Sequence, residues 1–313
     1  MPKPSLQLDQ VTAAVELIEQ AKKPFIVWGQ GVILGQAEEE FKNFVEKSGI
    51  PAAWTILGLS ALPTSHPSNR GMVGMHGNYA PNLLTNQCDL LIAVGMRFDD
   101  RVTGDLNTYA KQAKIIHLEL DPSEVNKNVR ADVTVLADCK DSLKAITEKI
   151  SSNTYPEWIA EFDRLDSIEE EKVIYNDLNP THEGLSMGES IKMINKHTQG
   201  NAVIVTDVGQ HQMATCRYAD FNFSKSNVTS GGLGTMGFAL PAAIGAKMGA
   251  PEREVVAVIG DGGYQMTIQE LGTIFQSQVA VKIVVLNNDF LGMVRPVSYT
   301  HLRAHETGRN RVC

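Results

Sequence analysis

Long hydrophobic stretches are missing from this 313-residue sequence. No run of about 18 consecutive apolar residues occurs, which is the length that a transmembrane helix needs. The first four residues, Met1-Pro2-Lys3-Pro4, contain nothing that resembles the apolar core of a secretory signal peptide. These absences predict a cytoplasmic protein without a membrane partner.

Cysteines are few, and basic residues are not in excess. The four cysteines, Cys88, Cys139, Cys216 and Cys313, are scattered and form no Cys-x-x-Cys pair, which favours reduced thiols over disulfides or a zinc site. The net charge of −8 argues against nucleic acid as a partner, because such proteins present a basic face. A phosphate ligand would therefore be held locally, by backbone N–H groups and a metal ion.

Strand and helix patterns alternate along the first 150 residues. Val11, Ala14, Val15 and Ile18 form one apolar helical stripe, and a strand over residues 25–28 follows. Further helices are predicted around residues 41–45 and over 142–150, and further strands over 90–94, 115–118 and 133–136. This alternation predicts a parallel sheet covered by helices on both faces.

The alternation returns after a polar stretch over residues 151–180, which we interpret as an inter-domain connection with one polar helix. A helix carries Ile191 and Ile194, an apolar helix covers 238–248, and strands are predicted over 202–206, 255–259 and 282–286. The predicted fold class is α/β, with two successive three-layer domains built on parallel sheets, at 1–150 and 181–295.

The strongest chemical motif is Gly260-Asp261-Gly262 followed, after residues 263–286, by Asn287-Asn288. Each half alone is a common turn sequence. Together, in a strand–helix–strand context, they bring Asp261 and Asn288 to the carboxyl ends of neighbouring strands, where ligands bind in open α/β sheets. A carboxylate and an amide oxygen suit Mg²⁺, and Gly262 with Gly263 allows a diphosphate to approach a helix start.

The segments 260–271 and 286–295 resemble acetolactate synthases, a family that uses thiamine diphosphate, Mg²⁺ and FAD. The resemblance implies that Asp261, Asn288 and the backbone carbonyl of Phe290 bind the metal. It implies that Met236, in the glycine-rich segment 230–238, supports the bent conformation of the cofactor. The thiamine diphosphate contacts implied are Gly209, Gln210, His211, Gly234, Met236, Asp261, Gly262, Gly263, Asn288, Gly292 and Met293.

Three glycine-containing loops of the first domain are expected to gather at one sheet edge. Gly29-Gln30-Gly31 alone is a weak dinucleotide signal, and the segments 74–77 and 94–104 are more specific because the latter sets two arginines, suited to binding a diphosphate, just past a strand. Acetolactate synthases have a similar segment along FAD. The resemblance assigns FAD to Gly29, Gln30, Gly31, Thr55, Ile56, Gly74, Met75, His76, Gly95, Arg97, Asp99, Arg101, Val102, Glu119, Leu120, Asp138 and Cys139.

The implied activity is the decarboxylating condensation of pyruvate with a second 2-oxoacid, pyruvate or 2-oxobutyrate, in isoleucine and valine biosynthesis. FAD would have a largely structural role, and the partners implied are a second copy of the chain and a small regulatory subunit. Two alternatives stay open: another thiamine-diphosphate carboligase or decarboxylase, which Met293-Val294-Arg295 and the loop 97–101 disfavour, and a cofactor-binding fragment without turnover.

Two departures from the family favour the fragment. The family's activating glutamate belongs to a further N-terminal domain, which we expect to be missing here, so no catalytic residue is assigned to this chain. Beyond Arg295 the resemblance ends, and Pro296-Val297-Ser298 stands where the family has Gln-Trp-Gln. We interpret 296–313 as a non-family, artefactual tail that resembles translated sequencing adapter, with a frameshift or a basic interaction tail as alternatives.

Overall fold

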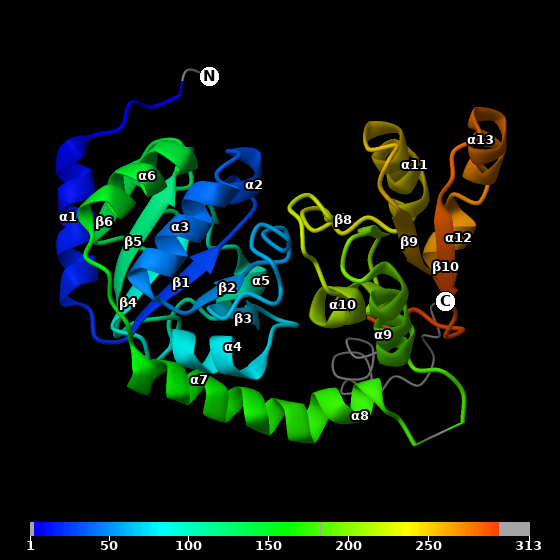
Figure 1. Ribbon diagram of the computed structural model, residues 1–313, viewed down its shortest axis with the longest axis horizontal. Helices are drawn as coiled ribbons and strands as arrows, with labels where there is room; N and C mark the ends of the chain where they lie inside the picture. Colours follow the sequence, from blue (N-terminus) through cyan, green and yellow to red (C-terminus); the bar gives the residue numbers. More distant parts are fainter. Residues whose placement is uncertain (1–2, 182, 294–313) are drawn as a thin grey trace, which may run out of the picture. The chain divides into compact units, whose positions relative to one another are not determined.

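The computed structural model describes residues 3–181 and 183–293, and the predicted tail lies outside them (Figure 1). The chain forms two compact units. Unit 1 is the chain up to Gly200 together with Ala219–Asn227, and unit 2 is Asn201–Tyr218 with the chain from Val228 onward. Within the described residues, no helix is both long and apolar enough to cross a membrane.

Unit 1 is built on a six-stranded sheet in the order β3-β2-β1-β4-β5-β6, and every pairing in it is parallel. The central strands β1 and β4 are continuous apolar runs that are buried throughout, as expected for strands covered on both faces. The strands are β1 (Pro24–Trp28), β2 (Ala52–Trp54), β3 (Asn69–Met72), β4 (Leu90–Val94), β5 (Lys114–Glu119) and β6 (Val133–Leu136).

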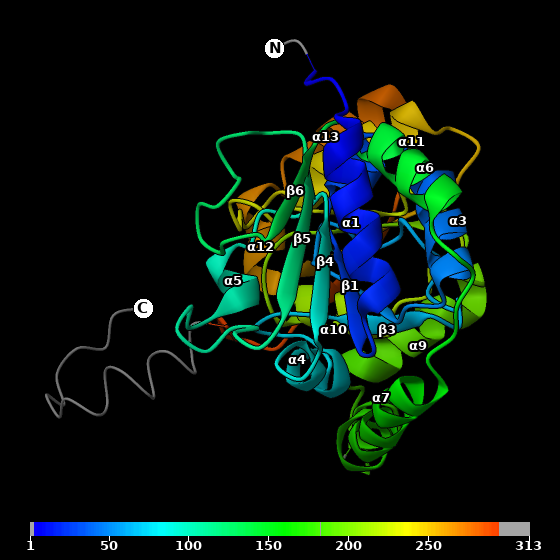
Figure 2. The same ribbon diagram turned by 90° about the vertical axis from the view of Figure 1, so that its left-hand side faces the viewer.

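Helices cover both faces of this sheet. Figure 2 shows α1, α3 and α6 on one side and α4 and α5 on the other, as right-handed crossovers require when the strand order reverses between β3 and β4. The Asp138 side chain caps α6 by accepting from the backbone N–H of Lys140. The helices are α1 (Leu8–Gln20), α2 (Gly31–Leu34), α3 (Glu38–Ser48), α4 (Tyr79–Thr85), α5 (Asp100–Thr103) and α6 (Cys139–Lys149).

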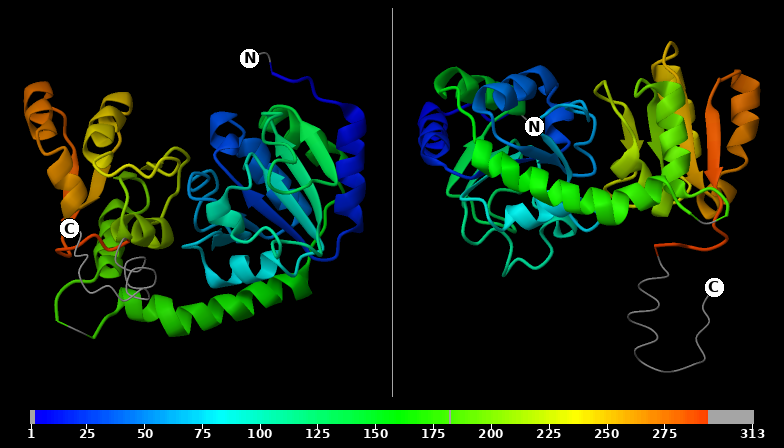
Figure 3. Two further views of the ribbon diagram at one scale, coloured as in Figure 1. Left: turned by 180° about the vertical axis from the view of Figure 1, so that it is seen from behind. Right: turned by 60° about the horizontal axis from the view of Figure 1, so that its bottom comes forward.

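The predicted polar connection is largely helical. It contains α7 (Pro156–Glu169), the π-helix η1 (Glu170–Ile174) and α8 (Tyr175–Leu178), which Figure 3 shows as one continuous helix, followed by α9 (Met187–Thr198). Ser186 and Glu189 start α9 with a reciprocal capping box.

Helix α7 is anchored to unit 1 by an aromatic side chain. The indole Nε1 of Trp158 donates to the carbonyl of Pro24 at 2.9 Å. Its ring lies 5.2 Å from that of Phe162, which in turn packs 5.3 Å from Phe25 of β1. The start of the connection therefore belongs to the core of unit 1.

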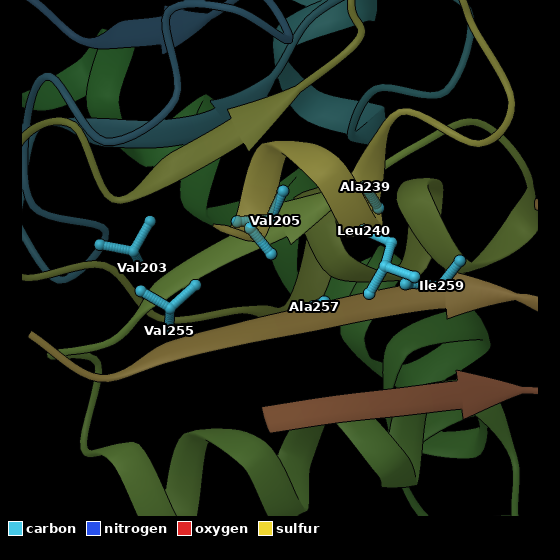
Figure 4. Close-up of a cluster of buried hydrophobic side chains, with 8 residues drawn as sticks. Val203, Val205, Ala239, Leu240, Val255, Ala257 and Ile259 are labelled. Carbon is cyan, nitrogen blue, oxygen red and sulfur yellow. The ribbon is translucent and has the colours of Figure 1, made fainter. Parts of the chain in front are cut away.

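Unit 2 contains a four-stranded sheet in the order β10-β9-β7-β8, in which β7, β9 and β10 are parallel. Its core lies between β7, β9 and α11, where valine, isoleucine and leucine side chains interdigitate (Figure 4). Its elements are β7 (Val203–Thr206), α10 (Gln210–Tyr218), β8 (Asn227–Thr229), α11 (Ala239–Gly249), β9 (Val255–Gly260), α12 (Asp261–Met266), α13 (Glu270–Ser277) and β10 (Lys282–Leu286).

The predicted fold class is confirmed: both sheets are parallel wherever a pairing is resolved, and helices pack on them. Every predicted strand is present within one or two residues of its expected bounds. The strands β2, β3 and β8 were not predicted, because they are short and β3 and β8 carry polar, half-buried residues.

We predict that Trp158→Ala lowers the free energy of unfolding of unit 1 by about 3–5 kcal/mol, since it removes a buried aromatic side chain and leaves a cavity. Tyr175→Ala, at a position 59% exposed on α8, is the control and should change stability by no more than about 0.5 kcal/mol. Urea unfolding can be followed by tryptophan fluorescence, because Trp28 and Trp54 also lie in unit 1. Equal midpoints for the two variants would contradict the anchoring role.

Candidate cofactor sites at two sheet edges

The two predicted metal-binding side chains stand at the ends of neighbouring parallel strands of unit 2. Leu286 of β10 pairs with Gly260 of β9, so Asp261 and Asn288 follow these strands by one and two residues. The Asn288 Oδ1 accepts from the backbone N–H of Phe290 at 3.3 Å, which brings the third predicted ligand to the same turn. The geometry agrees with the expected convergence, and metal binding stays a prediction.

Glycines allow four segments to approach one another around these residues. A Cβ at Gly292 would overlap the Gln210 side chain, whose Oε1 also accepts from Asn288 Nδ2 at 3.2 Å. A Cβ at Gly262 would lie 3.1 Å from the Met236 Cε and 3.3 Å from the Leu291 Cδ2. The predicted contacts therefore gather from the segments that follow β7, β9 and β10 and precede α11.

A buried hydrogen bond between Asp207 and His211 lies beneath this group. The carboxylate of Asp207, which follows β7, is fully buried, and its Oδ1 is 2.5 Å from the Nε2 of His211. The His211 ring is only 4% exposed and lies against the backbone of Gly209 and Gly260. His211 is thus not an isolated surface histidine, and one of its ring nitrogens is used inside the protein.

Asp207 was not identified from the sequence. The available signal was its position directly after the buried apolar strand β7, at the carboxyl end where ligands bind. An aspartate at such a position also occurs in ordinary turns. Its burial depends on residues far along the chain, which a single sequence does not bring together.

In unit 1, the loops after β1 and β4 pack backbone against backbone. The amides of Gly29 and Gly31 donate to the carbonyls of Val94 and Gly95, both at 2.9 Å. A Cβ at Gly29 or Gly31 would come within 2.5 Å of backbone atoms of Gly95, which itself has a φ of +56°. Only glycine permits this approach and this backbone conformation.

The third predicted loop joins the other two. Gly74 has a φ of +105°, and a Cβ there would lie 2.7 Å from the carbonyl oxygen of Arg101. The same carbonyl accepts from the backbone N–H of Met75 at 2.8 Å. The predicted gathering of the three loops at one sheet edge is confirmed, whereas binding of a flavin by these loops stays a prediction.

The loop after β4 presents cations to solvent. The guanidinium of Arg97 pairs with Asp99 at 2.8 Å but is 57% exposed, and that of Arg101 is 72% exposed. Partial burial by itself raises the pKa of the Asp99 carboxyl, but the amide of Arg101 and the charge of Arg97 outweigh it and hold the pKa below its usual range. Both arginines are accessible to an anion.

Five further predicted flavin residues lie at or after the ends of strands in unit 1. Thr55 and Ile56 follow β2, and Met75 and Leu120 expose apolar side chains at strand ends. Glu119, at the end of β5, accepts from the backbone amides of Leu120 and Asp121. Burial raises the pKa of this carboxyl, but the hydrogen bonds from His117 and those amides outweigh it and lower the pKa.

Asp138 and Cys139 are both buried within the protein. Besides capping α6, Asp138 accepts from the Lys3 ammonium at 2.6 Å, and Cys139 is buried at the first position of that helix. Across residues 3–181 and 183–293, no group of three or more His, Cys, Asp or Glu side chains could hold a metal. The predicted set of Asp261, Asn288 and the Phe290 carbonyl contains only one side chain of these types.

Two family descriptions match the sequence. Residues 11–146 match "Thiamine pyrophosphate enzyme, central domain", and residues 207–311 match "Thiamine pyrophosphate enzyme, C-terminal TPP binding domain". The first range contains all six strands of the sheet of unit 1. The second contains β8, β9 and β10 of unit 2 and begins directly after β7.

Curated relatives include acetolactate synthase large subunits. The protein of Lactococcus lactis is 40% identical over 288 residues, covering 92% of this chain and 49% of the relative. That of Corynebacterium glutamicum is 42% identical over 291 residues, covering 91% and 46%. The isozyme 3 large subunit of Escherichia coli is 38% identical over 288 residues, covering 91% and 50%. The chain spans about half the length of these relatives.

We predict that Gly31→Ala destabilises the protein by about 1–3 kcal/mol, because its Cβ would be driven into the backbone of Gly95. Gly245→Ala in α11 is the control, since a Cβ there meets nothing within 4 Å, and it should be neutral or stabilising by roughly 0.5–1 kcal/mol. Circular dichroism during urea unfolding reports on both units. A Gly31→Ala protein as stable as Gly245→Ala would show that the close approach is not needed.

Proposed function

The chain belongs to the thiamine pyrophosphate enzymes, and from this premise we propose that it functions as an acetolactate synthase large subunit. The proposed reaction condenses pyruvate, with loss of CO2, with a second 2-oxoacid, either pyruvate or 2-oxobutyrate. The observation that carries the proposal is the convergence of Asp261, Asn288, Met236 and the surrounding glycines at the carboxyl edge of unit 2. The roughly 40% identity to acetolactate synthase large subunits supports this activity over that of another thiamine-diphosphate enzyme.

The residues at this edge fit thiamine diphosphate and Mg²⁺. Asp261 and Asn288 offer hard oxygen ligands from adjacent strand ends, and Mg²⁺ requires few such ligands beside diphosphate oxygens and water. Asp261, Gly262 and Gly263 form the first turn of α12, where unpaired backbone N–H groups favour an anion. When bound, thiamine diphosphate supplies the stabilisation of the carbanion that decarboxylation generates.

The protein's own contribution is to bind and orient. The methyl group of Met236 lies against Gly262, so an unbranched apolar side chain is available to support a bent cofactor from below. The side chains of Gln210 and Asn288 are hydrogen-bonded to each other at 3.2 Å, which fixes one wall of the site before any ligand arrives. Positioning of this kind lowers the barrier by removing the entropy of orientation.

We also propose that unit 1 binds FAD at the edge formed by its three glycine loops. Arg97 and Arg101 provide accessible cations for a diphosphate, and the Glu119 carboxylate at the end of β5 provides an acceptor for hydroxyl groups. The exposed apolar side chains of Met75 and Leu120 suit a flat ring system. The proposed role of the flavin is structural.

The remaining parts of the proposal concern the whole protein. Its active form would contain at least two copies of the chain and would associate with a small regulatory subunit in the cytoplasm. The name "large subunit" of the relatives supports a smaller partner.

Asp261→Ala should abolish Mg²⁺-dependent binding of thiamine diphosphate, because it removes the only carboxylate of the proposed metal site. Glu252→Ala is the control, since this exposed carboxylate precedes β9 at the opposite end of the same strand. Isothermal titration calorimetry with and without Mg²⁺ measures the effect. The assignment fails if Asp261→Ala and Glu252→Ala bind the cofactor with equal affinity.

Arg97→Ala should reduce the amount of flavin that co-purifies with the protein, because it removes an accessible cation from the proposed diphosphate site. Arg164→Ala is a matched control: this arginine of α7 also pairs with a carboxylate and is likewise 57% exposed. The flavin absorbance per protein measures retention. Equal flavin content in the two variants would remove Arg97 from the site.

A further inference from the structure

We propose that Asp207 is a positioning residue of the thiamine diphosphate site, which holds three ligand-binding turns together and fixes the tautomer of His211. The inference rests on the proposed function of unit 2. Asp207 itself is fully buried and lies beneath the turns that would contact the cofactor.

One carboxylate contacts all three turns. Its Oδ1 is 2.5 Å from the Nε2 of His211, in the turn after β7. Its Oδ2 accepts from the backbone N–H of Gly237 at 2.9 Å, at the end of the glycine-rich loop that carries Met236. A Cβ at Gly263 would overlap the same Oδ2, so the turn after β9 packs directly on the carboxylate.

This position requires two acceptors. The Gly237 amide can only donate, and the bond from His211 is strongest when the ring also donates to an ionised oxygen. A buried carboxylate is tolerated only when its oxygens are satisfied in this way. An asparagine of the same shape offers one acceptor, so one of the two bonds must change.

A second hydrogen-bond network lies beside Asp207. The hydroxyl of Thr229 receives a hydrogen bond from Thr206 and another from the Gln212 amide, both at 2.7 Å. These groups lie beside Asp207 on β7, β8 and α10. This network contacts Asp207 through its backbone carbonyl, which accepts from the Thr229 hydroxyl at 3.5 Å.

The pairing determines what the other nitrogen of His211 can do. Because the carboxylate accepts from Nε2, that nitrogen carries the proton. The unprotonated Nδ1 is then the ring nitrogen that remains for contacts with other groups. A Cβ at Gly209 or Gly260 would lie 2.7 or 3.0 Å from Nδ1, which places this atom at the turn that leads into Asp261. Asp207 acts on the cofactor site through His211 and the two loops, without touching the cofactor.

The test is Asp207→Asn, with Glu252→Gln as the control. Asparagine can keep the bond to Gly237 only if its amide group donates to His211, and the ring then moves its proton to Nδ1. Nitrogen-15 NMR of the imidazole should report Nε2–H in the unmutated chain and Nδ1–H in Asp207→Asn. Calorimetry should report a loss of thiamine diphosphate affinity of about tenfold or more in the presence of Mg²⁺, and none in Glu252→Gln.

The outcomes separate this inference from the proposed function. If the unmutated chain binds no thiamine diphosphate, the proposed function fails, whatever the tautomer. If it binds and Asp207→Asn binds equally well, the positioning role is overturned. Should Asp207→Asn fail to fold, the spectrum of the unmutated chain still decides, because His211 protonated only on Nδ1 would overturn the proposal.

Discussion

The structure depends on the close approach of backbone turns at the carboxyl ends of parallel strands, which glycine alone permits. The loops that leave the carboxyl ends of parallel strands all lie at one edge of the sheet, but side chains would ordinarily keep those loops apart. Gly31 against Gly95 in unit 1, and Gly263 against Asp207 in unit 2, remove that separation. Residues of sequence-distant loops consequently lie side by side at each sheet edge.

The two sheet edges offer different groups for binding an anionic ligand. Unit 1 presents the accessible guanidinium groups of Arg97 and Arg101, so an anion could be bound directly. Unit 2 offers Asp261 and Asn288, whose oxygens would repel a diphosphate unless a divalent cation lies between them. A net charge of −8 is therefore compatible with the two proposed anionic cofactors, because their recognition would be local and would not rely on the overall field.

The sequence predicted those features that are local. Buried strands such as β1 and β4 are continuous apolar runs, and the turn residues after them follow from strand order. The strand β3, with the sequence Asn-Arg-Gly-Met, could not be predicted because its pairing with β2 determines its structure. Asp207 was not identified as a site residue for a related reason, since its partners Gly237 and Gly263 belong to other segments of unit 2.

In the proposed site, a divalent ion joins Asp261 and Asn288 to the diphosphate of thiamine diphosphate. Substituting Mn²⁺ for Mg²⁺ makes this arrangement directly measurable, because electron–nuclear double resonance detects the phosphorus nuclei of phosphate groups whose oxygens coordinate Mn²⁺. The account predicts strong phosphorus couplings when thiamine diphosphate is added to the unmutated chain and their loss in Asp261→Ala. Mn²⁺ bound to the protein without any phosphorus coupling would contradict it.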